Sequence, residues 1–206
     1  MKISQKGSMI GSTGKLIQEL PVVLASASPR RIAMLRDIGK DPIILRPECD
    51  ETIHTGLPPQ RTVMALSLRK LLWVREHMLS EDLPEDFVML SSDTVVSFEG
   101  EILGKPSDEE DAFRMLKEMS GRKNTVYSGC CVWRRRDGML RLFYDSTDVY
   151  FTPYTDRDIN AYIATGAPMD KAGAYGIQEG FDRYVERIDG EEDTVIGFPM
   201  TRLFSL

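Results

Sequence analysis

The feature that most constrains this chain is an apolar segment that passes through a turn of small residues directly into a helix. Residues 22–24 read Val-Val-Leu, and residues 25–28 read Ala-Ser-Ala-Ser. Ser28 stands at the predicted N-cap, and Pro29 suits the first helical position because its φ is fixed and it has no N–H. Apolar residues then recur at helical spacing up to residue 38. We therefore predict a strand, a tight turn and a helix in immediate succession.

The start of this predicted helix has the chemistry of an anion-binding site. Free backbone N–H groups, the hydroxyl groups of Ser26 and Ser28, and the guanidinium groups of Arg30 and Arg31 would converge on one point. A phosphate or a carboxylate needs such a group of donors. The alternative interpretation is a capped surface helix with two solvated arginines.

Size and composition favour one globular domain. The chain has 206 residues, of which 42% are hydrophobic and 28% charged, which is ordinary for a globular protein with a sizeable core. Its net charge of -6 argues against general binding to nucleic acid or to an anionic membrane. We expect residues 1–20, which are polar and contain Gly and Ser, to be a flexible extension of a domain over residues 21–206.

Cysteine and histidine usage narrows the function further. Cys49, Cys130 and Cys131 form no C-x-x-C pair, which argues against a disulfide framework and favours a reducing, cytoplasmic compartment. The sequence contains neither a run of about 18 apolar residues, as a membrane span requires, nor a signal-peptide core. Two histidines offer little material for a zinc site or a Ser-His-Asp triad.

The best candidate for a core strand, residues 87–96, carries a carboxylate in its middle. This segment reads Phe-Val-Met-Leu-Ser-Ser-Asp-Thr-Val-Val. Because burial of an unpaired charge is costly, Asp93 should have a metal, a cation or a hydrogen-bond network as its partner. A functional role for Asp93 is favoured over a structural one.

Three lysines occupy positions that are typical of binding sites. Lys70 interrupts the apolar face of a helix predicted over residues 60–79, where it either snorkels to water or points into a cleft. Lys105 lies in a short extended piece and is restricted by the proline that follows it. Lys171 belongs to the glycine-containing segment 168–180, which has neither a helical nor a strand period.

Together these residues predict a site for phosphate chemistry. Cations around a phosphate chain, with Glu51 and Asp93 sharing a divalent metal, are the equipment of nucleotide hydrolysis. No nucleophilic side chain is needed, because water can attack directly. The residues alone therefore predict a phosphate-ester or nucleotide ligand and a hydrolytic reaction. The cations of this predicted site are Arg30, Arg31, Lys70, Lys105 and Lys171.

Four separated motifs resemble those of the Maf family of nucleoside triphosphate pyrophosphatases. They are residues 24–31, 92–96, 103–106 and 170–178. The resemblance implies a mixed α/β (α+β) fold like that of the inosine triphosphatases, with helices on an extended mixed sheet and a cleft between two lobes. It also implies that a nucleoside triphosphate is hydrolysed to the monophosphate and pyrophosphate with a divalent metal, Mg²⁺ or Mn²⁺.

The resemblance also implies roles for individual residues. Asp93 matches the family's proposed proton acceptor. Asp93, Lys105 and Glu51 are expected to be catalytic. Glu51 and Asp93 are also the expected metal ligands. The expected substrate-binding residues are Ser26, Ser28, Arg30, Arg31, Lys70, Thr94, Lys171 and Gln178.

The branch of the family that acts on dTTP and UTP is similar to this chain at Arg30, Thr94 and Gln178, which are therefore the expected specificity residues. The Gln178 amide can both donate and accept, as a uracil or thymine edge requires. Pyrimidine triphosphates, modified ones included, are preferred over 7-methyl-GTP.

Two other functions remain as alternatives. The second hypothesis is a non-hydrolytic, nucleotide-binding regulator of cell division and septum formation. An RNA-binding module ranks third. Whether the protein forms a homodimer stays open.

Overall fold

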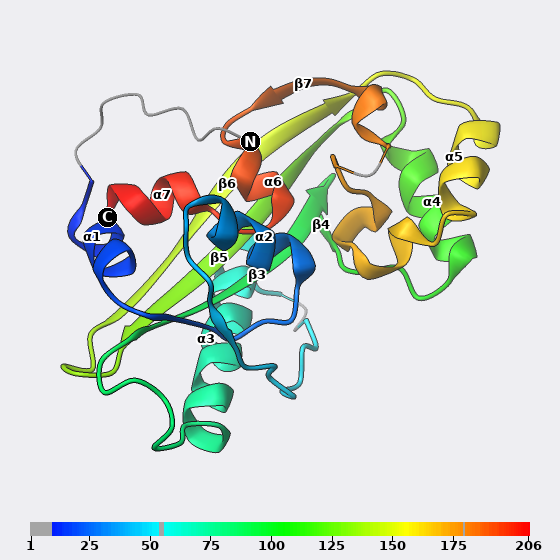
Figure 1. Cartoon of the computed structure of the whole chain (residues 1–206). Coiled ribbons are helices and arrows are strands. Elements are labelled where there is room, and N and C mark those ends of the chain that lie inside the picture. Colours follow the sequence, from blue (N-terminus) through cyan, green and yellow to red (C-terminus); the bar gives the residue numbers. More distant parts are fainter. Residues whose placement is uncertain (1–9, 54–55, 179) are drawn as a thin grey trace.

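The computed structural model describes residues 10–53, 56–178 and 180–206, and it confirms the mixed α/β class (Figure 1). The strands are β1 (Val22–Leu24), β2 (Ile43–Ile44), β3 (Val88–Phe98), β4 (Glu101–Leu103), β5 (Lys123–Arg134), β6 (Leu140–Phe151) and β7 (Val185–Asp189). The α-helices are α1 (Ser12–Glu19), α2 (Pro29–Asp37), α3 (Pro59–His77), α4 (Glu109–Met119), α5 (Asp156–Ile163), α6 (Glu192–Ile196) and α7 (Met200–Ser205). Short 3₁₀ turns are η1 (Ala167–Asp170), η2 (Ala172–Ala174) and η3 (Asp182–Tyr184).

All these strands belong to one mixed sheet with the order β2-β1-β3-β5-β6-β7, in which β4 also pairs with β3. β1 is parallel to both of its neighbours, and the other pairs are antiparallel. Along β3, the pairing with β1 extends to Leu90 and the pairing with β4 begins at Val96. β5 follows the other edge of β3 throughout this stretch. The edge of β3 between Leu90 and Val96 therefore has no strand partner within the described residues.

Two apolar cores cover the two faces of the sheet. On one face, Leu71 and Val74 of α3 pack with Met89 and Cys131. The alternate strand residues, such as Cys130, pack into a larger core with side chains from α2, α4, α5 and α7. Successive strand residues point to opposite faces, so the neighbouring cysteines lie in different cores and do not form a disulfide. No helix among the described residues is long and apolar enough to cross a membrane.

The N-terminal segment differs from the prediction. Residues 12–19 form α1, which lies beside α7 at the other end of the chain (Figure 1). The Ile17 side chain is fully buried, and the Gly11 N–H donates to the carbonyl of Phe204 at 2.8 Å. A Cβ on Gly14 would lie 2.9 Å from the same carbonyl oxygen. The glycines that suggested flexibility instead permit close helix packing, so the expected flexible extension is wrong for residues 12–19, whereas residues 1–9 lie outside the described residues.

α5 begins with a capping box. The Asp158 N–H donates to Thr155 Oγ1 at 3.3 Å, and the Thr155 N–H donates to the Asp158 carboxylate at 2.9 Å. Thr155→Ala should lower Tm by about 2–4 °C, because loss of an N-cap costs about 1 kcal/mol and that is the shift expected for a domain of this size. Thermal melts followed by circular dichroism test this. Thr155→Ser keeps the hydroxyl and should have the Tm of the wild type. If Thr155→Ala also has the wild-type Tm, the cap does not stabilise the protein.

Candidate functional site

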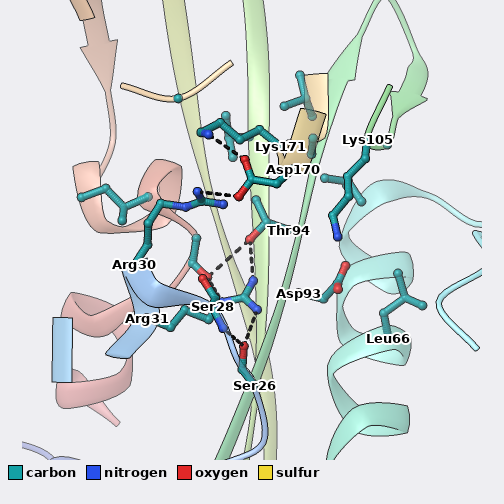
Figure 2. A pocket seen from close by; sticks show the side chains of 18 of the residues that line it. Ser26, Ser28, Arg30, Arg31, Leu66, Asp93, Thr94, Lys105, Asp170 and Lys171 are labelled. Carbon is teal, nitrogen blue, oxygen red and sulfur yellow. Dashed lines mark hydrogen bonds and ion pairs between the residues drawn. The ribbon is translucent and has the colours of Figure 1, made fainter. Parts of the chain in front are cut away.

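A cavity of about 670 Å³ lies at the unpaired stretch of the β3 edge (Figure 2). Because successive strand residues point to opposite faces, Asp93 reaches this cavity from the face covered by α3 and Thr94 reaches it from the face that carries α2. The cavity wall includes every residue that the sequence predicted for the site: Ser26, Ser28, Arg30, Arg31, Glu51, Lys70, Asp93, Thr94, Lys105, Lys171 and Gln178.

Lys70 reaches Asp93 because α3 approaches the sheet closely. The strand register places Gly129 of β5 opposite Asp93. A Cβ on Gly129 would lie only 2.4 Å from the carbonyl oxygen of Val63, so glycine allows the helix backbone to lie directly on the strand. About two helical turns further along α3, Lys70 Nζ donates to Asp93 Oδ1 at 2.5 Å. Lys70 thus points into the cleft rather than to water.

A second carboxylate faces the same ammonium group. Lys70 Nζ lies 3.1 Å from Glu51 Oε2, so it bridges Glu51 and Asp93. The side chains of Lys70 and Asp93 are only 8% and 10% exposed, whereas that of Glu51 is 46% exposed. Lys70 is therefore the cation that the burial of Asp93 required, and Glu51 lies nearer the solvent.

The two carboxylates suit a divalent cation that arrives with a phosphate chain. In proteins, Mg²⁺ is commonly held by one or two carboxylates together with phosphate oxygens and water. Glu51 and Asp93 offer such oxygens at the cavity wall. The described residues contain no group of three or more His, Cys, Asp or Glu side chains that could hold a metal by itself.

The turn between β1 and α2 places one arginine deep in the cavity. The Arg31 guanidinium donates to the Gly197 carbonyl at 2.9 Å, to Ser26 Oγ at 3.3 Å and to Thr94 Oγ1 at 3.4 Å. Burial lowers the pKa of Arg31, and the negative charge of Asp93 opposes this effect. Arginine remains charged at neutral pH because its ordinary pKa lies far above 7. Three acceptors thus hold a fixed positive charge against the cavity wall.

Ser28 occupies the predicted N-cap position, but its side chain makes no capping hydrogen bond. Instead, the Ser28 N–H donates to Ser26 Oγ at 3.2 Å. Pro29 stands in the first helical turn, as predicted. The first N–H groups of α2 are therefore not occupied by the Ser28 hydroxyl, which suits the binding of an anion at this helix start.

Asp170, which is not among the residues predicted for the site, links two of the predicted cations (Figure 2). Its Oδ2 accepts from Arg30 Nη1 at 3.2 Å, and its Oδ1 accepts from Lys171 Nζ at 2.7 Å. Burial alone would raise the pKa of Asp170, but the hydrogen bond from Lys171 and the charge of Arg30 lower it. The sequence feature that could have pointed to Asp170 is its place directly before Lys171, in the motif of residues 170–178. Arg46 also lines the cavity, and no sequence pattern pointed to it.

Glycines in the segment around Lys171 allow contacts between protein atoms. Gly173 has φ +64°, and a Cβ there would lie 2.8 Å from Val96 Cγ2. A Cβ on Gly176 would lie 2.7 Å from Lys171 Cε. The segment can therefore pack against β3 and around the buried Lys171 side chain.

Lys105 and Gln178 lie at the exposed rim of the cavity. Figure 2 shows the Lys105 ammonium group pointing toward the Asp93 carboxylate. Neither side chain makes a hydrogen bond within the part of the chain that the structure describes. Both can therefore turn toward a ligand without breaking a contact there.

A mixed sheet with a cationic cavity beside a buried aspartate suits an enzyme of phosphate chemistry. The sequence matches the model of the Maf-like protein family over residues 21–206, and the chain belongs to that family. A dTTP/UTP pyrophosphatase of Agathobacter rectalis is 40% identical over 193 residues, which cover 89% of this chain and 94% of the relative. Proteins of the same name from Caldicellulosiruptor saccharolyticus and Bacillus thuringiensis subsp. konkukian are 40% and 38% identical over 182 residues. These matches cover 88% of this chain and 90% and 91% of the relatives.

Proposed function

We propose that this protein hydrolyses dTTP and UTP to the nucleoside monophosphate and pyrophosphate. The names of its relatives support this substrate class. The observation that carries the proposal is that cations from distant parts of the chain and two carboxylates line one cavity. The cations are Arg30, Arg31, Lys70, Lys105 and Lys171.

The phosphate chain would lie against the β1–α2 turn. Arg31 and the first N–H groups of α2 supply donors and positive charge for phosphate oxygens. The Ser26 and Ser28 hydroxyls add neutral donors at the same turn. Lys105, pointing toward Asp93, would offset the negative charge that gathers on the phosphates as the anhydride bond breaks.

Asp93 would act as the general base. Its carboxylate would orient a water molecule and accept a proton as the water oxygen attacks the α-phosphorus. The bond from the α-phosphorus to the bridging oxygen breaks, and pyrophosphate leaves with the electron pair of that bond. Lys70 pairs with the buried carboxylate and holds it in place at the cavity wall. Glu51 and Asp93 would hold a divalent metal, which would supply charge neutralisation at the phosphates.

A pyrophosphate-release assay tests this function. UTP, dTTP and 7-methyl-GTP are incubated with the protein and Mg²⁺ or Mn²⁺, and the products are separated by chromatography. Release of pyrophosphate and monophosphate from UTP and dTTP supports the proposal. Nucleotide binding without turnover would instead favour the regulator of septum formation.

A cytoplasmic location stays part of this proposal, in keeping with three unpaired cysteines.

Specificity should depend on the base reader at the cavity rim. We expect Gln178→Ala to weaken the preference for UTP over GTP by about tenfold, the value of one lost hydrogen bond, with a smaller effect on kcat for UTP. Values of kcat/KM for both nucleotides test this. Equal losses of kcat/KM for every nucleotide would contradict a role in reading the base.

A further inference from the structure

An arginine that the proposed function does not use also lines the cavity. Arg46 is exposed, and its side chain makes no hydrogen bond or ion pair within the part of the chain that the structure describes. The other two arginines of the cavity wall have protein partners, because Arg30 pairs with Asp170 and Arg31 donates to Ser26 Oγ. The donors of Arg46 are therefore available to a ligand.

Strand pairing places Arg46 beside the β1–α2 turn. β1 and β2 are parallel with Leu24 opposite Ile44, and the Leu45 N–H donates to the Leu24 carbonyl at 3.0 Å. Two residues beyond this pair lie Ser26 on one segment and Arg46 on the other, and both line the cavity. Ligands of open α/β sheets bind at the carboxyl ends of parallel strands, which is where these two residues stand.

The residue after Arg46 restricts its backbone. Pro47 follows it in the sequence, and a residue that precedes a proline is held in the extended region. Only the side chain therefore has to turn when a ligand arrives. A guanidinium offers two parallel N–H donors that match two oxygens of one phosphate, which the single ammonium group of a lysine cannot do. Arg46 thus has the chemistry of a phosphate-binding residue.

The order of the strands assigns Arg46 to the far end of the phosphate chain. β1 lies between β2 and β3, and neighbouring strands are about 4.8 Å apart. Arg46 follows β2 and Asp93 belongs to β3, so the β1–α2 turn lies between them. In the proposed function, Asp93 activates the water that attacks the α-phosphorus, and the phosphate chain lies against this turn. A chain that begins near Asp93 and crosses the turn brings its last phosphate toward Arg46.

We propose that Arg46 binds the terminal phosphate of the substrate and thereby selects nucleoside triphosphates over diphosphates. This rests on the proposed function, which places the phosphate chain at the β1–α2 turn. Carboxylates already offset part of the positive charge of the cavity, since Asp170 pairs with both Arg30 and Lys171. Arg46 adds positive charge for a polyanion without a carboxylate that the polyanion would have to displace.

Binding in the absence of metal tests this role without turnover. Isothermal titration gives Kd for UTP, UDP and UMP. We expect Arg46→Gln to raise Kd for UTP by more than tenfold, the value of a charge-assisted hydrogen bond, and to leave Kd for UDP and UMP unchanged. The matched control is Arg157→Gln, which removes an exposed arginine of α5 outside the cavity and should leave all three values unchanged.

Turnover gives a second measurement of the same role. Arg46→Gln should lower kcat/KM for UTP but not for UDP, and inorganic pyrophosphate should inhibit the variant less than it inhibits the wild type. An unchanged affinity for UTP overturns the inference, and so does an equal loss of affinity for UTP and UMP, which would place Arg46 at the α-phosphate or the nucleoside. Absence of pyrophosphate release by the wild type overturns the proposed function instead, and the titrations with UTP, UDP and UMP still decide the role of Arg46.

Discussion

Asp93→Asn should reduce kcat for UTP hydrolysis by about 10³-fold while nucleotide binding is kept. An amide has nearly the same shape as a carboxylate but cannot accept a proton from water, and general-base catalysis contributes about 10²- to 10⁴-fold. The cations of the β1–α2 turn are untouched by this change. Steady-state pyrophosphate release gives kcat, and isothermal titration with UTP in the absence of metal gives the affinity.

The control for Asp93→Asn is Glu101→Gln, which removes an exposed carboxylate from β4. It should hydrolyse UTP at the wild-type rate. If Asp93→Asn keeps more than a tenth of the wild-type kcat, Asp93 is not the proton acceptor. If its affinity for UTP falls as steeply as kcat, the residue acts through the shape of the cavity.

Gly129→Ala should have the largest effect on stability. The added Cβ would lie 2.4 Å from the Val63 carbonyl oxygen, which is backbone and cannot turn aside. Overpacking of this kind costs about 3 kcal/mol, or about 6–12 °C in Tm for a chain of this length. Displacement of α3 would also draw Lys70 away from Asp93, so the variant should lose UTP hydrolysis even where it is folded.

Urea denaturation and pyrophosphate release at 20 °C measure the two effects of Gly129→Ala. Gly104→Ala is a matched stability control, because its Cβ would meet only Ile53 Cδ1 at 3.4 Å, an ordinary contact. Wild-type stability of Gly129→Ala would show that α3 can move outward without cost, and Gly129 would then not be the residue that lets Lys70 reach Asp93.

The predictable parts of this protein depend on local sequence. The strand, turn and helix around Ser28 follow from apolar spacing and from Pro29, which act within a few residues. The need of Asp93 for a partner also follows from its own segment. These signals identified the elements and most of the charged residues that line the cavity.

The parts that sequence could not predict depend on contacts between distant segments. Whether Lys70 pointed to water or into the cleft was decided by Gly129, which lies on another element. The packing of α1 depends on α7, at the opposite end of the chain. Asp170 meets Arg30 only in the folded protein, and no local pattern connects these two residues.

The unpaired edge of β3 between Leu90 and Val96 allows the size of the cavity opening to change without disturbing the core. Its length is set by where β1 and β4 stop pairing, and both are short strands outside the long antiparallel centre. One more or one fewer paired residue in either would narrow or widen the opening by about 3.3 Å. A change of strand-end length would therefore alter the opening of the cavity, while β3, β5 and β6 stay as they are.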